Sequence, residues 1–440
     1  MTTESIVKQL IAPSTYEQQI DELHHDSKNK NNNFPDIGIQ TLHLHQNKIS
    51  KLLAHEMETQ GYQPHVVLER IIRVKDKSRL ICKLKPVDHI IQRAICQTIM
   101  PQLKEYLTTH VYSYKERSNY IAARNFARFI RQSHKNNKLD LFVIRTDVKS
   151  YTDTIPIAEN SPLWEKIEDI LNWLKIDAEF HEYLSSLIKQ FIRPTIKMQS
   201  GLAYQRLYGL PMGSPLTAII SLIYLNDIDR FMASQPKTFY ARYGDDILIA
   251  HHEMDQIIEL DKILQSSLTN LGLKLNPDKH QIIFLTESGS PHPTHPNFQH
   301  SQKITYLGFD IWASGTIGLK LKAQRQLLKD TQERIRNLIQ LYQHYDLQTQ
   351  GKLLCRALNQ SFDYRHPLAN EKLLILLNCI TEREQLKQLD FIIALYIAQT
   401  LSGINGTKAF RKIAYKKIRQ QWKLKSLCQL RNQRYKTWTY

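Results

Sequence analysis

The sequence predicts an α+β protein in which strands and helices are mixed up to about residue 320 and helices alone follow. The strands are indicated by short apolar runs between turn residues, as in 139–148, where Leu141 to Ile144 are continuously apolar. Helices are indicated by apolar residues at three- and four-residue spacing, as in 87–103. The segment 321–440 shows that helical spacing and no strand pattern.

The order of elements follows from these patterns and from the turn residues between them. We expect strands at 66–84 (a hairpin turning at Asp76-Lys77-Ser78), 139–148, 239–242 and 247–251, and helices at 87–103, 161–192, 215–232 and 254–271. Three domains are predicted: a polar, helical N-terminal extension (1–62), a mixed domain (63–320) and a helical domain (321–440).

Charge and cysteine usage narrow the class of partner. The net charge of +17 favours a polyanion such as nucleic acid or an anionic surface. The 5 cysteines form no C-x-x-C pair, which gives little support to a zinc site or a disulfide framework. The longest apolar run, 391–398, is far below the roughly 20 residues of a membrane span. We therefore expect a cytoplasmic protein with no membrane partner.

Two acidic positions suggest chemistry. Asp147 ends an apolar strand, and Asp245 and Asp246 lie at the tip of a predicted hairpin. Carboxylates beside a core are costly unless they bind cations or basic groups. Phosphoryl transfer gives a reason for them, because paired Mg²⁺ ions need carboxylate ligands. The competing interpretation is that Asp-Asp simply makes a good turn.

Several segments, in order, resemble the motifs of reverse transcriptases. Tyr243-Gly244-Asp245-Asp246 resembles their Y-x-D-D box. Further resemblances are Arg73–Arg79 and Asp88–Ala94 (fingers), Arg145–Tyr151 (metal-binding strand), Gly209–Leu216 with Ile223–Asp229 (template and nucleotide loop and helix), Leu271–Lys279, and Ile304–Phe309 (primer grip). The resemblance covers about 65 to 320 and implies a right-hand polymerase, with fingers and palm at 63–320 and a helical thumb with a basic nucleic-acid-binding extension at 321–440.

The resemblance also implies metal and triphosphate ligands. Asp147 and Asp245 would bind Mg²⁺, or Mn²⁺ in its place, with Asp246 as a supporting ligand and the carbonyl of Val148 as another. Lys75 and Arg79 would grip the triphosphate of a dNTP. A solvated basic hairpin is the alternative for those two residues.

Further roles come with the same resemblance. Gly213 would let the backbone approach the base or template, or it is a plain turn glycine. Lys279 would protonate the pyrophosphate leaving group, or it is a surface lysine. The primer-grip residues Tyr306, Leu307 and Gly308 would position the primer end, or they form a core hairpin.

The sequence departs from the family where the sugar is selected. The residue that blocks a ribose 2′-hydroxyl is usually aromatic, but here it is Thr152, with Tyr151 before it. Either Tyr151 takes that place, or the enzyme tolerates ribonucleotides. Met212 replaces the glutamine common before the motif glycine, and Gly244 is more typical of RNA-dependent RNA polymerases.

The C-terminal region predicts a nucleic-acid contact. After Asp390 the chain has no acidic residue, and lysines and arginines alternate with aromatic residues, among them Phe410, Tyr415 and Trp422. This mixture suits phosphate neutralisation with base stacking. The alternative is a basic amphipathic helix whose aromatic residues pack on the domain.

The resemblance implies a nucleotidyltransferase that makes a DNA product from dNTPs on an RNA template or with none. Its RNA partner would be the template, a non-coding RNA or both. The short architecture resembles bacterial unknown-group, defence-associated enzymes, which implies antiviral defence; a retron-type or intron-derived enzyme is also consistent. Two other functions stay open: an RNA-synthesising polymerase, and a non-enzymatic RNA-binding or splicing cofactor. The sequence does not decide between a protein partner and a homo-oligomer.

Overall fold

The computed structural model confirms the α+β class, with many helices and antiparallel-rich sheets. It describes residues 4–29, 37–74, 77–115, 117–136, 140–198, 201–294, 298–361 and 379–435. The chain forms two compact units: unit 1 is Met1–Glu116 with Ile144–Gln281, and unit 2 is Arg117–Val143 with Ile282–Tyr440. The three domains expected from the sequence stay a prediction.

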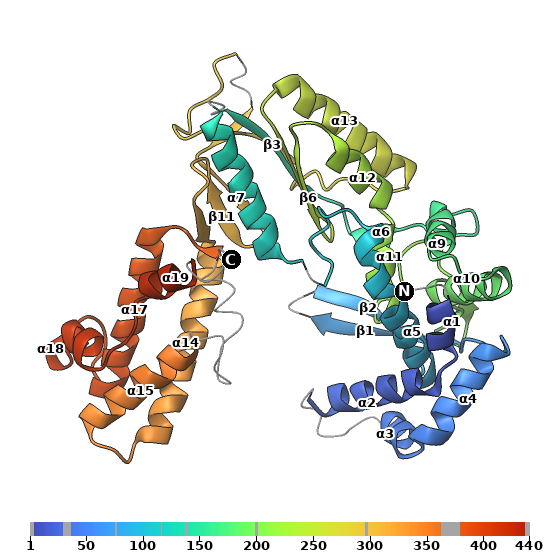
Figure 1. The fold of residues 1–440 in the computed structure, drawn as a ribbon, viewed down its shortest axis with the longest axis horizontal. Helices are drawn as coiled ribbons and strands as arrows, with labels where there is room; N and C mark the ends of the chain where they lie inside the picture. Colours follow the sequence, from blue (N-terminus) through green and yellow to red (C-terminus); the bar gives the residue numbers. More distant parts are fainter. Residues whose placement is uncertain are drawn as a thin grey trace. The chain divides into compact units, whose positions relative to one another are not determined.

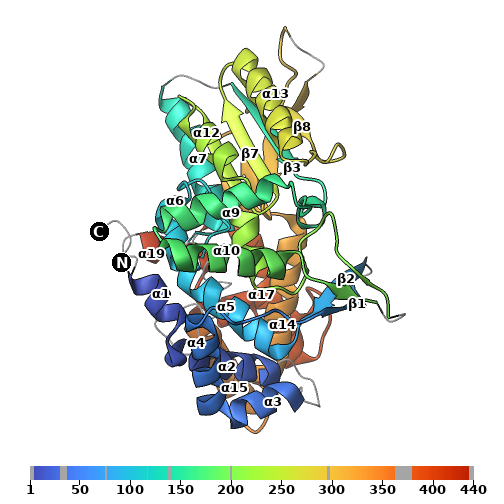
Figure 2. The same ribbon diagram turned by 90° about the vertical axis from the view of Figure 1, so that its right-hand side faces the viewer.

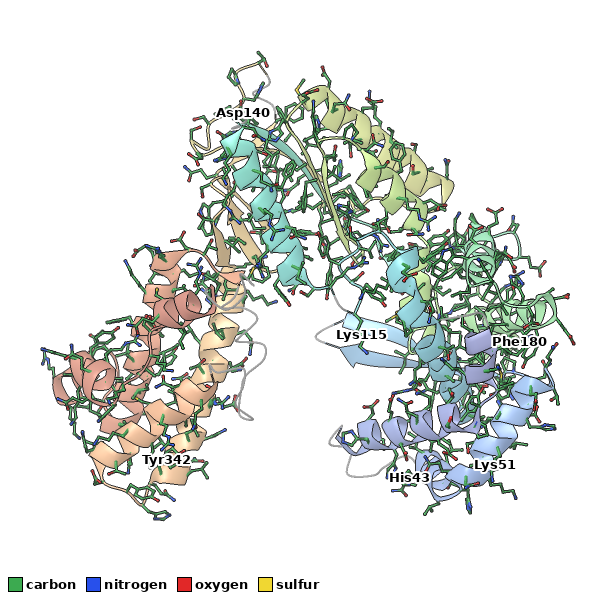
Figure 3. The ribbon with its side chains drawn as sticks, in the orientation of Figure 1. His43, Lys51, Lys115, Asp140, Phe180 and Tyr342 are labelled. Atoms are coloured by element: carbon green, nitrogen blue, oxygen red, sulfur yellow. The ribbon has the colours of Figure 1, made fainter. Side chains whose placement is uncertain are left out.

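Unit 1 begins with five helices that pack on one another, and the second of them contacts the third, the fourth and the fifth (Figures 1 and 2). They are α1 (Glu4–Leu10), α2 (Pro13–Asn29), α3 (Ile37–Leu44), α4 (Gln46–Glu58) and α5 (Pro86–Ile99). Leu10, Tyr16 and Met57 are buried in this layer, whereas labelled surface residues such as Lys51 carry the charge (Figure 3). The polar extension is therefore a packed helical layer.

The predicted hairpin at 66–84 is confirmed as β1 (Val67–Val74) and β2 (Lys77–Lys83), paired antiparallel from Leu68↔Lys83 to Val74↔Lys77. The turn predicted at Asp76-Lys77-Ser78 is wrong in extent, because Lys77 and Ser78 already pair with β1 as part of β2. The strand β4 (Ile196–Lys197) runs parallel to β1, and β5 (Ala203–Tyr204) pairs with β4. The second hairpin also forms as predicted, from β6 (Phe239–Tyr243) and β7 (Asp246–His251).

In unit 1, β7 lies between β6 and β3 (Leu141–Asp147). Two helices, α12 (Asn226–Ser234) and α13 (Met254–Asn270), pack against β6 and β7 (Figure 1). Unit 1 also contains four short helices: η1 (Met100–Gln102), α6 (Leu103–Tyr106), α8 (Tyr151–Thr154) and α11 (Leu216–Ile223).

Two predicted helices are wrong in extent, since each is a pair. The segment 161–192 forms α9 (Pro162–Trp173) and α10 (Ala178–Ile192), because Lys175 has a left-handed backbone (φ 54°) and the Asp177 side chain caps a new helix by accepting from Phe180 N. The segment 215–232 breaks between α11 and α12, where Leu225 leaves the helical conformation (φ −101°, ψ 9°).

Unit 2 combines one helix, small sheets and a helical bundle. Its helix α7 (Asn119–Lys135) packs on the antiparallel sheet of β10 (Lys303–Tyr306), β11 (Phe309–Trp312) and β12 (Ile317–Leu319). Strand β8 (Gln281–Leu285) pairs in parallel with β9 (Gln299–Ser301).

The end of the chain is helical, as predicted, over its described stretches (Figure 1, orange and red). The bundle consists of α14 (Leu321–Tyr342), α15 (Leu347–Ser361), α17 (Arg383–Ser402), α18 (Ala409–Lys412), the π-helical turn η2 (Lys417–Gln421) and α19 (Leu427–Tyr435). Within it, α14 contacts α15 and α17, and α17 contacts α18 and α19. Across the parts of the chain that the structure describes, no helix combines the length and the apolar character needed to span a membrane.

Candidate active site

The structure brings the three predicted carboxylates together from two segments of unit 1. Asp147 is the last residue of β3, Asp245 lies in the turn between β6 and β7, and Asp246 begins β7. Val148 N donates to the carbonyl of Asp245 (3.1 Å), which ties the end of β3 to the turn. Gly244 has the left-handed backbone (φ 65°) that this tight turn requires.

The cluster carries more negative charge than its surroundings neutralise. Burial, together with the nearby Asp245 and Asp147 carboxylates, raises the pKa of Asp246 to about 6. Asp147 is only 4% exposed, and its buried Oδ1 has no hydrogen-bond partner. Its Oδ2 accepts from Lys279 Nζ (2.6 Å). Buried carboxylate oxygens in surplus are the ligands that Mg²⁺ prefers.

These carboxylate oxygens are therefore suitable ligands for a divalent cation. They do not lie close enough together to coordinate one in this structure. Among the described residues, no three His, Cys, Asp or Glu side chains are close enough to hold a metal ion. The unpartnered Asp147 oxygen and the raised pKa of Asp246 still fit a cation site, because carboxylates without a cation repel one another. In this state the Lys279 ammonium neutralises Asp147.

A hollow of about 970 Å³ opens beside the carboxylates, which is large enough for a nucleotide. Its lining is Asp147, Lys149, Ser150, Tyr151, Thr152, Asp153, Arg206, Tyr208, Gly209, Met212, Ser221, Gly244, Asp245, Asn276, Asp278 and Lys279. Five residues predicted for catalysis or nucleotide binding thus meet at one hollow: Asp147, Tyr151, Thr152, Asp245 and Lys279.

The side chain of Tyr151 is fixed in the protein interior. It is buried, and its hydroxyl donates to the carbonyl of Ser221 (2.9 Å). Burial raises the pKa of this hydroxyl. Thr152 has its hydroxyl 4.0 Å from the Met212 sulfur. Tyr151, Thr152 and Met212 all line the hollow, and their role in sugar selection stays a prediction.

Gly213 is held against the β1–β2 hairpin. Cys82 N donates to the carbonyl of Met212 (2.8 Å), and a Cβ on Gly213 (φ 103°) would lie 3.1 Å from the carbonyl oxygen of Cys82. This close approach explains the glycine, and Gly213 is not among the lining residues. Lys75 lies outside the described residues, as does the side chain of Arg79, so the nucleotide-binding roles of these three stay predictions.

The residues of the primer-grip motif form the turn between β10 and β11 in unit 2. Tyr306 is buried, and Leu307 (φ 49°) and Gly308 (φ 90°) make the turn. The carbonyl of Leu307 accepts from Asn119 Nδ2 (3.3 Å), and that of Gly308 accepts from Lys320 N (3.0 Å). Their role toward a primer stays a prediction.

The sequence interpretation missed Arg242, which supports the catalytic turn from inside the core. This fully buried side chain donates to the Asp229 carboxylate (Nε–Oδ1 2.7 Å), to the carbonyl of Leu222 (2.9 Å) and to that of Gly244 (3.1 Å). The hydroxyl of Tyr240 also donates to Asp229 Oδ1 (2.6 Å). The available signal was an arginine in an otherwise apolar strand directly before the turn.

Comparison with known proteins identifies the family. A family model described as "Reverse transcriptase (RNA-dependent DNA polymerase)" matches residues 71–311, more than half of the chain. No curated protein matches the chain.

Among solved structures, the chain is similar to apo telomerase from Candida tropicalis (TM-score 0.45, 14% identity, 95% of this chain and 85% of that chain). It is also similar to the same organism's apo telomerase truncated from its C-terminal domain (0.45, 16%, 64% and 67%) and to telomerase from Candida albicans in complex with a fragment of telomeric RNA (0.43, 14%, 85% and 65%). The family assignment rests on the match of residues 71–311: this chain belongs to the reverse transcriptase family and is an RNA-directed DNA polymerase, a nucleotidyltransferase.

Proposed function

We propose that the enzyme extends a primer with deoxynucleotides on an RNA template, using divalent metal ions held by Asp147, Asp245 and Asp246. Mg²⁺ is the expected metal, with Mn²⁺ as its substitute. The observation that carries the proposal is the meeting of these carboxylates, with an unpartnered oxygen on Asp147, beside a hollow large enough for a nucleotide.

When bound, two such ions supply charge stabilisation for the attacking and leaving oxygens of the transfer. Asp147 and Asp245 would hold the ions, Asp246 would support them, and the carbonyl of Val148 would be a further ligand. The side chain of Lys279 is 61% exposed, so it is able to swing from Asp147 toward a leaving group. Its hydrogen bond to Asp147 raises its pKa while the two are paired, and away from Asp147 an ordinary lysine ammonium still carries a proton at neutral pH that it could donate to pyrophosphate.

A second candidate function is RNA synthesis from NTPs, and one observation favours it. Tyr151 is anchored to Ser221 in the interior, which leaves the smaller Thr152 beside Met212 at the wall. A threonine hydroxyl can hydrogen-bond a ribose hydroxyl instead of excluding it.

The deciding experiment supplies labelled dNTPs and, separately, NTPs to the purified protein with Mg²⁺ and a primed RNA template. The variant Asp245→Asn/Asp246→Asn removes the ligands, and Asp255→Asn/Glu259→Gln, on the exposed face of α13, makes the same charge change away from the hollow. We expect DNA synthesis that only the first variant abolishes. Product from NTPs alone would replace the proposal by RNA synthesis, and equal activity in both variants would refute the carboxylate assignment.

The biological setting that we propose is bacterial antiphage defence, and the support for it is the resemblance to unknown-group, defence-associated enzymes. Synthesis with no template belongs to the same proposal. Nuclease treatment of the purified protein before the dNTP assay tests it: product that survives the loss of all RNA supports template-independent synthesis. Phage plating on bacteria that carry the wild-type gene or Asp245→Asn/Asp246→Asn tests defence, which predicts protection by the wild type only.

A further inference from the structure

Unit 2 contains a second hollow, built from two segments that are far apart in the sequence. Its volume is about 570 Å³. One wall comes from α15 and the other from the end of η2 and the residues that follow it. The lining residues are Lys352, Arg356, Asn359, Gln360, Gln421, Trp422, Lys423 and Lys425, to which we refer as the basic hollow.

The basic hollow is strongly cationic. Four of its lining residues are charged and exposed, namely Lys352, Arg356, Lys423 and Lys425. None of its lining residues is acidic. Among the described residues, none of these four has a carboxylate within ion-pair distance. The nearby Asp390 is committed elsewhere, because it pairs with Arg419 (2.8 Å) and accepts from Leu427 N (3.0 Å).

The segment that carries Lys423 and Lys425 is fixed by hydrogen bonds. Asn359 Nδ2 donates to the carbonyl of Lys423 (2.8 Å), and Lys425 N donates to Asn359 Oδ1 (2.9 Å). Arg419 donates to the carbonyl of Lys425 (3.0 Å), and Lys423 itself is held in the left-handed region (φ 58°). A fixed backbone lowers the entropy that a ligand must overcome, so the cations are preorganised.

The aromatic wall of the basic hollow is not a stacking platform. Trp422 is 3% exposed, and its Nε1 donates to Gln348 (3.0 Å). Its ring lies directly on α15 at Gly351, where a Cβ would come within 2.3 Å. Phe410 and Tyr415 likewise pack on each other (ring centroids 5.9 Å apart). Recognition here therefore falls to charge rather than to stacked bases.

We propose that the basic hollow binds the sugar–phosphate backbone of a nucleic-acid strand, through adjacent phosphates that the four cations neutralise. A hollow of this size takes a nucleotide-sized part of a strand. The inference rests on the proposed function for the identity of the polymer, whereas the binding itself needs no synthesis. RNA and DNA share the phosphate chemistry, and the experiment distinguishes them.

The test measures fluorescence anisotropy of a labelled single-stranded RNA, and of the DNA of the same sequence, over a series of salt concentrations. The hollow variant is Lys352→Gln/Arg356→Gln/Lys423→Gln/Lys425→Gln. Its matched control is Lys48→Gln/Lys51→Gln/Lys189→Gln/Lys262→Gln, four exposed lysines on α4, α10 and α13 with the same loss of charge outside the basic C-terminal segment. We expect binding to weaken at least about tenfold, and the log–log salt slope to fall by about 3, in the hollow variant alone.

If both variants bound the nucleic acid equally weakly, the proposal would be overturned, because the loss of affinity would then follow from the lower net charge alone. Should the fourfold variant fold poorly, Lys352→Glu/Arg356→Glu on the exposed face of α15 tests the same hollow. Preference of the hollow for RNA identifies a template or RNA partner as the ligand, and preference for DNA identifies the product. Asp245→Asn/Asp246→Asn must bind like the wild type, so a failure of the catalytic proposal is recognised separately.

Discussion

At the scale of single residues, the Lys279 ammonium lies 2.6 Å from Asp147 Oδ2. A metal ion that binds Asp147 would therefore compete with Lys279 for this carboxylate. We predict that Lys279→Gln binds Mn²⁺ about three- to fivefold more tightly, since a partly exposed ion pair contributes up to ~1 kcal/mol. The same change should lower the rate of nucleotide addition by about 100-fold if Lys279 is the general acid, as we propose. Titration calorimetry and single-turnover kinetics report the two effects.

The control for that prediction is Lys262→Gln, an exposed lysine on α13 with the same change of charge. Unchanged Mn²⁺ affinity in Lys279→Gln would show that the ammonium does not compete with the metal. An unchanged rate would show that Lys279 is not the proton donor. The two outcomes are independent of each other.

A second prediction at this scale concerns Thr152, which we propose to contact the sugar of the nucleotide. Since its side chain contacts Met212 and Tyr151 is anchored elsewhere, Thr152→Phe adds bulk at the wall of the hollow. We predict that kcat/KM for NTPs falls at least about tenfold relative to that for dNTPs. Thr154→Phe, in the same short helix, is the comparison. A ratio that does not move would place the sugar away from Thr152.

At the scale of elements, the Arg242–Asp229 pair joins β6 and α12 and holds the carbonyl of Gly244. We predict that Arg242→Met costs about 3–5 kcal/mol, because it leaves a buried carboxylate unpaired, and that Arg242→Met/Asp229→Asn recovers most of this stability. Nucleotide addition should stay impaired in the double variant, because the turn has lost its donor. Denaturant unfolding and dNTP incorporation separate the effects; recovered activity would mean that Arg242 is structural only.

The loop before α11 gives a second prediction at this scale. Gly209 and Gly201 have nearly the same left-handed backbone (φ 88° and 89°), but a Cβ on Gly209 would lie 2.9 Å from the carbonyl oxygen of Asp153, whereas Gly201 faces open space. Gly201→Ala should therefore cost about 1 kcal/mol for its backbone alone. Gly209→Ala should cost more and distort the hollow that it lines. Equal unfolding free energies would contradict the close approach.

The hairpins and the carboxylates were predictable because their signals are local: apolar runs, turn residues and a motif in one stretch of chain. The split of 161–192 into two helices depends on Lys175 and on the Asp177 cap, which an apolar helical pattern conceals. The role of Arg242 depends on partners in other elements, and no local pattern encodes them. The same holds for Tyr151, whose aromatic character is visible in the sequence although its hydrogen bond to Ser221 is not.

At the scale of the whole molecule, the net charge of +17 is unevenly distributed between the candidate sites. Unit 1 keeps a cluster of three carboxylates, of which Lys279 neutralises Asp147, and unit 2 keeps a hollow whose four cations have no carboxylate within ion-pair distance among the described residues. The sequence shows the run of basic residues after Asp390, but it does not show that Lys423 and Lys425 meet Lys352 and Arg356. It also leaves open whether Trp422 stacks on bases or packs on Gly351, because that depends on the distant helix α15.

Because the two sites depend on different residues, their ligands should stabilise the protein independently. Mg²⁺ at about ten times its Kd should stabilise the wild type by ~1.4 kcal/mol, and a short RNA should add its own increment. In calorimetry, Asp245→Asn/Asp246→Asn should lose the Mg²⁺ response and keep the RNA response, and the fourfold hollow variant should do the reverse. This crossed result holds whether the units unfold together or separately, since each variant removes only one binding equilibrium. A catalytic variant that lost both responses would show that RNA is bound chiefly through the metal site.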